Sequence, residues 1–230
     1  MKNDLKLGMK AGIPICLGYL SVSFGFGILA VKMGLPAWVA VLISATNLTS
    51  AGQVAGVGVI AASGPYIEMI LTQVLINLRY SLMGISLSQK LSDDFSTPHR
   101  ILASFGITDE VFGVSSAREK EVTPAYMYGM IIVAFAGWVM GTFLGALSGE
   151  LLPKVLVNAL GIMLYGMFIA IIIPPIKERS ANLAVILIAA AISCCLYYFV
   201  PGISNGFSII ISAVIAAGIM AKIAPVKEVE

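Results

Sequence analysis

The stretch "QVLINLRYSLMGISL", Gln73 to Leu87, is the most informative part of the sequence because it places a permanent positive charge in an apolar segment. Leu, Ile, Met and Tyr side chains fill the segment, and Arg79 lies near its middle. An arginine at the centre of a membrane helix costs about 2.5–3.5 kcal/mol on insertion scales. We therefore expect other polar groups of the protein to compensate for Arg79.

The composition around this stretch is that of a membrane protein. Of the 230 residues, 59% are hydrophobic and 11% are charged, and the mean hydropathy is +0.97. A soluble domain has about 25% charged residues. The apolar residues form long blocks, several of which approach the roughly 20 residues that a helix needs to cross a bilayer. The sequence predicts an all-α, polytopic transmembrane helical bundle in the cell membrane.

Seven apolar blocks are clear, and short connections rich in Gly, Pro or charged residues separate them. They cover about 12–31, 38–62, 67–88, 127–147, 155–175, 183–200 and 203–221. Residues 100–118 form an eighth candidate with Asp109 and Glu110 at its centre, which favours a short, broken or amphipathic element. Lys and Arg are enriched on cytoplasmic flanks. With or without the eighth crossing, nine basic residues lie inside and four outside, so the C-terminus is expected to be cytoplasmic. The side of the N-terminus stays open.

We expect residues 1–230 to form one membrane-embedded permease domain. Residues 10–90 and 125–221 are loosely similar, because each contains a turn, then Leu-Pro, then an apolar segment rich in small residues. This similarity predicts an internal repeat, as in many transporter folds. The basic, then apolar N-terminus imitates a signal peptide, but we interpret it as an uncleaved first span.

Several classes of function are disfavoured by what the sequence contains. The net charge of +2 gives no basic surface for nucleic acid. Cys16, Cys194 and Cys195 lie in apolar blocks without metal-ligand spacing, and His99 is the only histidine. We find none of the common hydrolase or metalloprotease motifs, so a membrane-embedded enzyme is the weaker alternative. No cofactor or metal is expected.

A second polar feature lies in "SATNLTSAGQVAG", Ser44 to Gly56, halfway through an apolar block. On a regular helix its polar residues would occupy two adjoining faces. Such a face lines a cavity, or marks a break in the helix where freed backbone groups bind a ligand. The candidate substrate-binding or translocation residues in this stretch are Thr46, Asn47, Ser50 and Gln53.

The third block adds Asn77 and Arg79 to the candidates. They are two residues apart and so point about 200° from one another on a regular helix. We expect both to meet polar groups only if that helix is broken or buried on all sides. Asp109 and Glu110 are the best partners for Arg79. Such an ion pair is either purely structural or part of a site that meets substrate or a coupling proton, and the sequence leaves this open.

Three motifs together resemble a known family. They are "AGQ" (51–53), "NLRYSLMGISLS" (77–88) and "TDEVFG" (108–113), and the Asn-x-Arg-x-x-Leu-Met-Gly pattern is the most specific of them. The chain resembles the AzlC family, the large subunit of branched-chain amino acid exporters. The family's polar motifs fall on Gln53, Asn77, Arg79, Asp109 and Glu110. Gln53 departs from the usual spacing by one or two residues.

The resemblance implies a membrane permease that exports branched-chain amino acids, coupled to protons, with a small hydrophobic AzlD-like subunit as partner. Arg79 then offers a bidentate partner for the substrate carboxylate. Asp109 or Glu110 takes the substrate ammonium or the exchanged proton. The alternative within the same class is a transporter or channel for another small solute. The sequence does not give the preferred amino acid, the direction of transport, the coupling ion or the stoichiometry with a partner.

Overall fold

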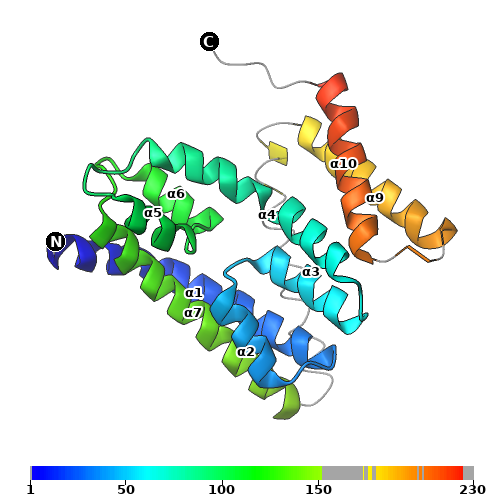
Figure 1. The fold of residues 1–230 in the computed structure, drawn as a ribbon, viewed down its shortest axis with the longest axis horizontal. Coiled ribbons are helices and arrows are strands. Elements are labelled where there is room, and N and C mark those ends of the chain that lie inside the picture. Colours follow the sequence, from blue (N-terminus) through cyan, green and yellow to red (C-terminus); the bar gives the residue numbers. More distant parts are fainter. Residues whose placement is uncertain are drawn as a thin grey trace. The chain divides into compact units, whose positions relative to one another are not determined.

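The computed structural model describes residues 2–151, 173, 176–177, 180–200, 202–203 and 205–224. These residues form helices and no strand (Figure 1). The helices are α1 (Lys2–Lys32), α2 (Ala37–Thr46), α3 (Ser50–Ala61), α4 (Tyr66–Ser88), α5 (Thr97–Ser104), α6 (Asp109–Ala117), α7 (Pro124–Leu151), α9 (Ala181–Phe199) and α10 (Asn205–Ile223). Within the described ranges, α1, α4, α7 and α9 are long and apolar enough to cross a membrane. The predicted helical membrane bundle is confirmed.

Contacts divide the chain into two compact units. The first contains residues 1–54 and 76–164, and the second contains residues 55–75 and 165–230. The polar residues of the candidate functional site all lie in the first unit. In the second unit, α9 and α10 pack on one another, and Glu68 in the first turn of α4 is buried.

The centre of the first unit is the close pair formed by α1 and α7. Glycines let the two backbones touch: a Cβ atom on Gly137 would lie 2.5 Å from the carbonyl oxygen of Cys16, and a Cβ on Gly145 would overlap that of Phe24. Gly129 meets Leu5 in the same way. The residue numbers of these contacts increase together along both helices, from Leu5 with Gly129 to Phe24 with Gly145. Helices α1 and α7 therefore run parallel. The chain must therefore return once from the end of α1 to the start of α7.

The block predicted at 38–62 is broken, as one of the two sequence interpretations expected. Helix α2 ends at Thr46, residues 47–49 are not helical, and α3 begins at Ser50. Asn, Thr and Ser side chains compete with the helical backbone for hydrogen bonds, which explains a break in this run. The chain also reverses direction here. The evidence is a hydrogen bond of 2.7 Å that the Gln53 side chain donates to Ser44 in α2. The helical faces drawn through residues 46–53 therefore do not exist.

Residues 100–118 form two short helices rather than a span. Helix α5 starts beside the beginning of α7, where His99 bonds Tyr128, and ends beside its middle, where Phe105 packs on Phe135. Residues 105–108 turn the chain, and α6 runs back until Ser115 contacts Met127. The helices α5 and α6 thus form a hairpin that reaches to about mid-depth of α7 and returns. The interpretation as a short, broken element is confirmed.

Polar contacts tie together one end of the first unit. Arg118 pairs with Asp4 at 3.5 Å, and Thr123 bonds the same carboxylate. Lys90, just after α4, donates to the carbonyl of Ser116. The start of α1, the end of α4, the base of the α5–α6 hairpin and the start of α7 therefore lie at one end of the α1–α7 pair. The internal repeat stays a prediction, because much of its second half falls at 152–172, outside the described residues.

Candidate functional site

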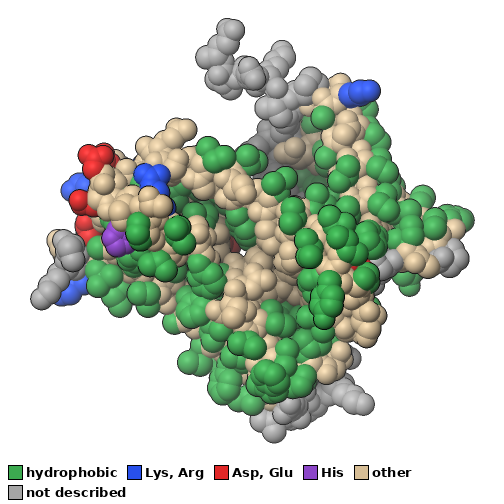
Figure 2. Space-filling view, in the orientation of Figure 1, with side chains coloured by type: hydrophobic (Ala, Val, Ile, Leu, Met, Phe, Trp, Pro, Cys, Tyr) green, Lys and Arg blue, Asp and Glu red, His purple; other side chains and the backbone are tan. Residues whose placement is uncertain are grey.

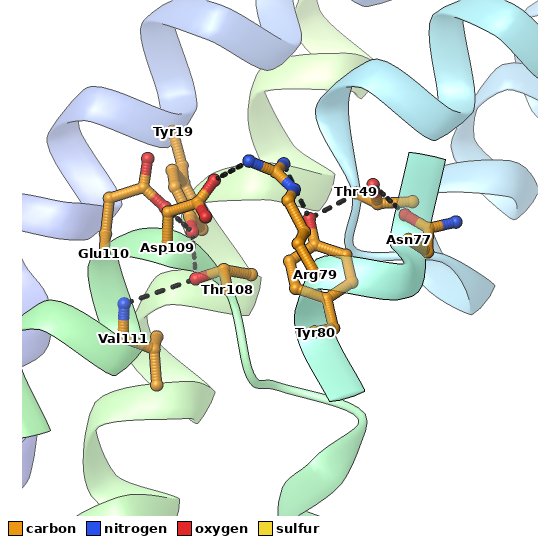
Figure 3. A network of polar contacts seen from close by, with 9 residues as sticks. All are labelled: Tyr19, Thr49, Asn77, Arg79, Tyr80, Thr108, Asp109, Glu110 and Val111. Atoms are coloured by element: carbon orange, nitrogen blue, oxygen red, sulfur yellow. Dashed lines mark hydrogen bonds and ion pairs between the residues drawn. The ribbon is translucent and has the colours of Figure 1, made fainter. Parts of the chain in front are cut away.

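The charge of Arg79 is compensated by Asp109. Nη1 of Arg79 lies 2.7 Å from Oδ2 of Asp109, and the two side chains are 34% and 35% exposed (Figure 3). Arg79 comes from α4 and Asp109 is the first residue of α6. The pair thus joins two elements 30 residues apart in sequence and is not enclosed by the described residues.

A chain of hydrogen bonds continues from the other side of the guanidinium. Nη2 of Arg79 donates to Oη of Tyr80 at 3.3 Å, and Tyr80 donates to Oγ1 of Thr49 at 3.2 Å. Thr49 in turn donates to Oδ1 of Asn77 at 2.8 Å. Each hydroxyl accepts one bond and donates the next, so the bonds polarise one another. This chain connects Arg79 to the break between α2 and α3 (Figure 3).

This arrangement corrects the expectation for Asn77 and Arg79. Helix α4 is regular from Tyr66 to Ser88, and most of it is not buried, yet both side chains meet polar groups. The break at 47–49 brings Thr49 within reach of Asn77. The long side chain of Arg79 bends toward the neighbouring Tyr80, whose ring centroid lies 5.0 Å from the guanidinium carbon.

Glu110, the second predicted carboxylate, takes a different partner. Oη of Tyr19 on α1 lies 2.6 Å from Oε2 of Glu110 and 2.5 Å from Oγ1 of Thr108. A phenol has one hydrogen and a carboxylate only accepts, so Tyr19 donates to Glu110 and accepts from Thr108. Thr108 also caps α6, because its Oγ1 accepts a bond from the backbone N–H of Val111. Tyr19 therefore fixes the tip of the α5–α6 hairpin against α1.

Two chain reversals meet in this network from opposite ends of the first unit. The α2–α3 reversal follows directly on the end of α1, and the α5–α6 hairpin starts at the beginning of α7. Thr49 comes from the first reversal and Asp109 from the second, and Arg79 with Tyr80 bridges them. Helices α3 and α6 both begin at these tips, so the positive ends of two helix dipoles lie close to the network.

Gln53 lies in a separate, closed network. It is 1% exposed, its Nε2 donates to Ser44, and its Oε1 accepts from the indole of Trp138 at 2.8 Å. Ser44 also bonds Thr142 at 2.7 Å, and Trp138 packs edge-on against Tyr19. Gln53 therefore holds α2 and α3 against α7. Its predicted contact with substrate stays a prediction.

The remaining predicted residues lie around the first break. Thr46 is exposed, and its hydroxyl donates to the carbonyl of Leu42 at 2.8 Å within its own helix. Asn47 is the partly buried C-cap of α2 in an extended conformation, and Ser50 opens α3. Their roles in translocation stay predictions. In the part of the chain that the structure describes, no group of three or more His, Cys, Asp or Glu side chains is placed to hold a metal ion.

The environment of Asp109 affects its titration. Helix α6 is not one of the helices long enough to span a membrane. Burial raises the pKa of the Asp109 carboxyl above its usual value, although the charge of Arg79 acts in the opposite direction. Glu110 adds a smaller upward contribution to this pKa. Asp109 is therefore easier to protonate than an ordinary aspartate.

Sequence reasoning missed the residues that link the candidates. Tyr19, Tyr80, Thr108 and Trp138 occur in apolar or capping contexts, where aromatic residues usually pack in a core. Tyr19 is 91 residues from Glu110, and no local pattern predicts such a contact. The one available signal was Thr108 before Asp109 and Glu110, a residue type that prefers the N-cap of a helix.

These features define a class of protein. A polytopic helical membrane protein in which broken helices bring polar groups to about mid-depth has the architecture of many membrane transporters. Comparison then gives the particular family: residues 14–152 match the model of the AzlC protein family, and the chain belongs to this family. The family is one of membrane transport proteins, which agrees with the fold.

Two relatives extend the match. The chain is 32% identical over 181 residues to an uncharacterized membrane protein of Archaeoglobus fulgidus. This alignment covers 77% of this chain and 78% of the relative. It is 26% identical over 201 residues to the inner membrane protein YgaZ of Escherichia coli. This alignment covers 84% of this chain and 82% of the relative. No solved structure matches the chain significantly.

Proposed function

We propose that this transporter exports branched-chain amino acids in exchange for protons, with the Arg79–Asp109 pair as the centre of its substrate site. The observation that carries the proposal is the partly exposed ion pair where the two chain reversals meet. Family membership supports amino acids as the class of substrate. The accessible guanidinium supports a substrate with a carboxylate.

The proposed binding step is an exchange of carboxylates at Arg79. A guanidinium has five N–H donors in a planar fork that matches a carboxylate bidentately. The substrate carboxylate displaces Asp109 from this fork, so the charge of Arg79 remains paired throughout. Tyr80 keeps its bond to the other side of the guanidinium and holds the fork in place.

The displaced Asp109 carboxylate pairs with the substrate ammonium, for which it must be ionised, so substrate and proton compete for Asp109. In an antiporter cycle, Asp109 takes up a proton outside after the substrate has departed, and its raised pKa favours this uptake. The proton leaves to the cytoplasm before the next substrate binds. Binding of substrate and release of the proton are thereby linked through a single residue.

A small, very hydrophobic AzlD-like subunit is the proposed partner. The resemblance implies such a subunit, and α9 offers an apolar surface of which none is buried within the described chain. We also propose that the protein lies in the cell membrane with its C-terminus in the cytoplasm.

The test is efflux of preloaded labelled leucine, isoleucine, valine and methionine from cells that express this chain. Cells with and without the neighbouring small hydrophobic subunit are compared, and Arg79→Lys is the variant. Lysine keeps the charge but replaces the fork by a point charge. Arg118→Lys is the matched control, because it makes the same change in the Arg118–Asp4 ion pair, away from the polar network.

Arg79→Lys is expected to reach normal membrane abundance and to lower efflux at least about tenfold, since a charge-assisted hydrogen bond contributes about 1.5–3 kcal/mol. Arg118→Lys is expected to keep most of the activity. Full efflux by Arg79→Lys at normal abundance rules out the carboxylate clamp. No efflux of any tested amino acid with any pairing overturns the proposed substrate class.

A further inference from the structure

An apolar cavity of about 220 Å³ lies in the first unit, beside the α5–α6 hairpin. We call it the apolar chamber. Its apolar lining comes from α4, the connection after it, α5, the tip of the hairpin and the start of α7. The apolar residues are Leu87, Leu91, Phe95, Ala103, Ile107 and Met127, and Gly84, Ser88, Arg100 and Ser104 complete the lining. Pockets for drug-sized ligands measure about 300–1,000 Å³, so this chamber suits a smaller group.

The chamber is near the polar network along the sequence at two points, although none of the network residues lines it. Ile107 lines it and is followed directly by Thr108 and Asp109. Gly84 also lines it and lies four residues after Tyr80, on the same face of α4 and one turn away. The hydroxyl of Tyr80 binds Arg79. Gly84, at the near edge of the chamber, is roughly 6–8 Å along α4 from Tyr80 and Arg79, and Leu87 lies farther along the helix.

The chamber belongs to the basic end of the first unit. Gly84, Leu87 and Leu91 lead from the network toward Lys90, which bonds the base of the hairpin. At this end lie seven basic residues, and Figure 2 shows charged side chains gathered over α5 and α6. They are Lys2, Lys6, Lys10, Lys90, Arg100, Arg118 and Lys120. At the opposite end, Lys32 is the basic residue within the described part of the first unit. Because cytoplasmic flanks carry the excess of Lys and Arg, this end faces the cytoplasm.

We propose that the apolar chamber receives the aliphatic side chain of the amino acid on the cytoplasmic side, before export. This inference rests on the proposed function and adds the residues that select the side chain. The carboxylate is held at Arg79 and the branched chain lies between α4, α5 and the start of α7. Size and shape of this space then decide which aliphatic amino acids are accepted.

Gly84 allows a test with little disturbance of the fold. A Cβ atom added at Gly84 meets no heavy atom within 4 Å, so Gly84→Leu adds a side chain at the α4 wall of the chamber without backbone strain. Gly18→Leu is the matched control, because Gly18 is also helical and free of neighbours within 4 Å, and it does not line the chamber. Efflux of labelled leucine is measured for both variants over a range of internal leucine concentrations, at matched membrane abundance.

Gly84→Leu is expected to raise the leucine concentration for half-maximal efflux at least about tenfold, the change in affinity that 1.4 kcal/mol gives. Gly18→Leu is expected to behave like the wild type. A normal half-saturation in Gly84→Leu overturns the chamber and leaves the proposed function standing. A wild type that exports no leucine overturns the proposed function itself.

A second measurement tests the chamber even if Gly84→Leu does not fold. Ser88 lines the chamber, and Ser88→Cys is made after Cys16, Cys194 and Cys195 are replaced by Ala. Reaction with a membrane-impermeant thiol reagent is expected from the cytoplasmic side, in inside-out vesicles, and leucine is expected to slow it. Reaction from the outside alone, or reaction that leucine does not slow, contradicts the proposal.

Discussion

Arg79 shows how a single charged residue organises the site at the residue scale. Its guanidinium binds Asp109 on one side and Tyr80 on the other, so the charge is shared between two chain reversals. The pair is about one-third exposed, so the described residues leave part of both charged groups uncovered. The proposed binding step uses this uncovered part of Arg79.

The titration of Asp109 gives a prediction at this scale. Because burial raises its pKa above the usual value of about 3.9, Asp109 gains its proton earlier than an ordinary aspartate as the pH falls. The proton removes the negative charge with which Asp109 holds the substrate ammonium. We expect the affinity of purified protein for leucine to fall as the pH falls through this titration.

Asp109→Asn is expected to remove this pH dependence, because the amide cannot titrate. Glu110→Gln is the matched control, since Glu110 pairs with Tyr19 instead of Arg79. Calorimetric titration with leucine at several pH values measures the slope for each protein. An equal slope in wild type and Asp109→Asn assigns the pH dependence to another group.

Part of this residue-scale arrangement could be predicted from sequence. A buried arginine requires a carboxylate, and few were available in apolar context, so Asp109 and Glu110 were the natural partners of Arg79. The sequence could not distinguish them, because the choice depends on how α6 is rotated at its first turn. Tyr19 determines that rotation from 91 residues away. Gln53 was predicted as a polar residue at depth, but its bonds to Ser44 and Trp138 depend on the packing of three helices.

Close packing of α1 on α7 positions the site at the scale of elements. Glycines on both helices remove the side chains that would separate the backbones. Tyr19 and Trp138, which pack on each other, bring this pair into contact with both polar networks. The spacing of these glycines is visible in the sequence, but the partner helix of each is not.

Gly145→Ala is predicted to destabilise the protein by about 1–3 kcal/mol, the range for overpacking a close contact. Its new Cβ would overlap the backbone of Phe24. Gly18→Ala is predicted to have the opposite sign, a gain of about 0.5–1 kcal/mol, because alanine favours a helix and the position is open. Thermal unfolding of the detergent-solubilised protein compares the two. A Gly145→Ala protein as stable as Gly18→Ala contradicts the observed packing.

The α2–α3 reversal and the α5–α6 hairpin enter the first unit from opposite ends. Together they define the topology of the described N-terminal part of the molecule. Since α1 and α7 are parallel, an odd number of crossings separates them. Helix α4 is the helix between them that is long enough to span, and residues 100–118 turn back. A break within residues 44–56 was one of the two interpretations of their Thr, Asn and Ser residues. It could not give the reversal, which depends on the contact of Gln53 with Ser44.

Cysteine labelling tests this topology. In a protein without native cysteines, Asp94→Cys and Lys120→Cys are expected to react with an impermeant reagent from the same, cytoplasmic side. Both positions are exposed and flank the α5–α6 hairpin. Met33→Cys, exposed after the end of α1, is expected to react from the other side. Labelling of Asp94→Cys and Lys120→Cys from opposite sides shows that residues 100–118 cross the membrane after all.

The central claim is that Arg79 binds the carboxylate of the substrate, and paired ligands test it most directly. Equilibrium binding of leucine and of leucinamide, which lacks the carboxylate charge, is measured on wild type and on Arg79→Lys. In the wild type, leucine is predicted to bind about 10–100-fold more tightly than leucinamide, from one charge-assisted contact of about 1.5–3 kcal/mol. In Arg79→Lys this ratio is predicted to fall toward one. A ratio that is the same in both proteins contradicts the account.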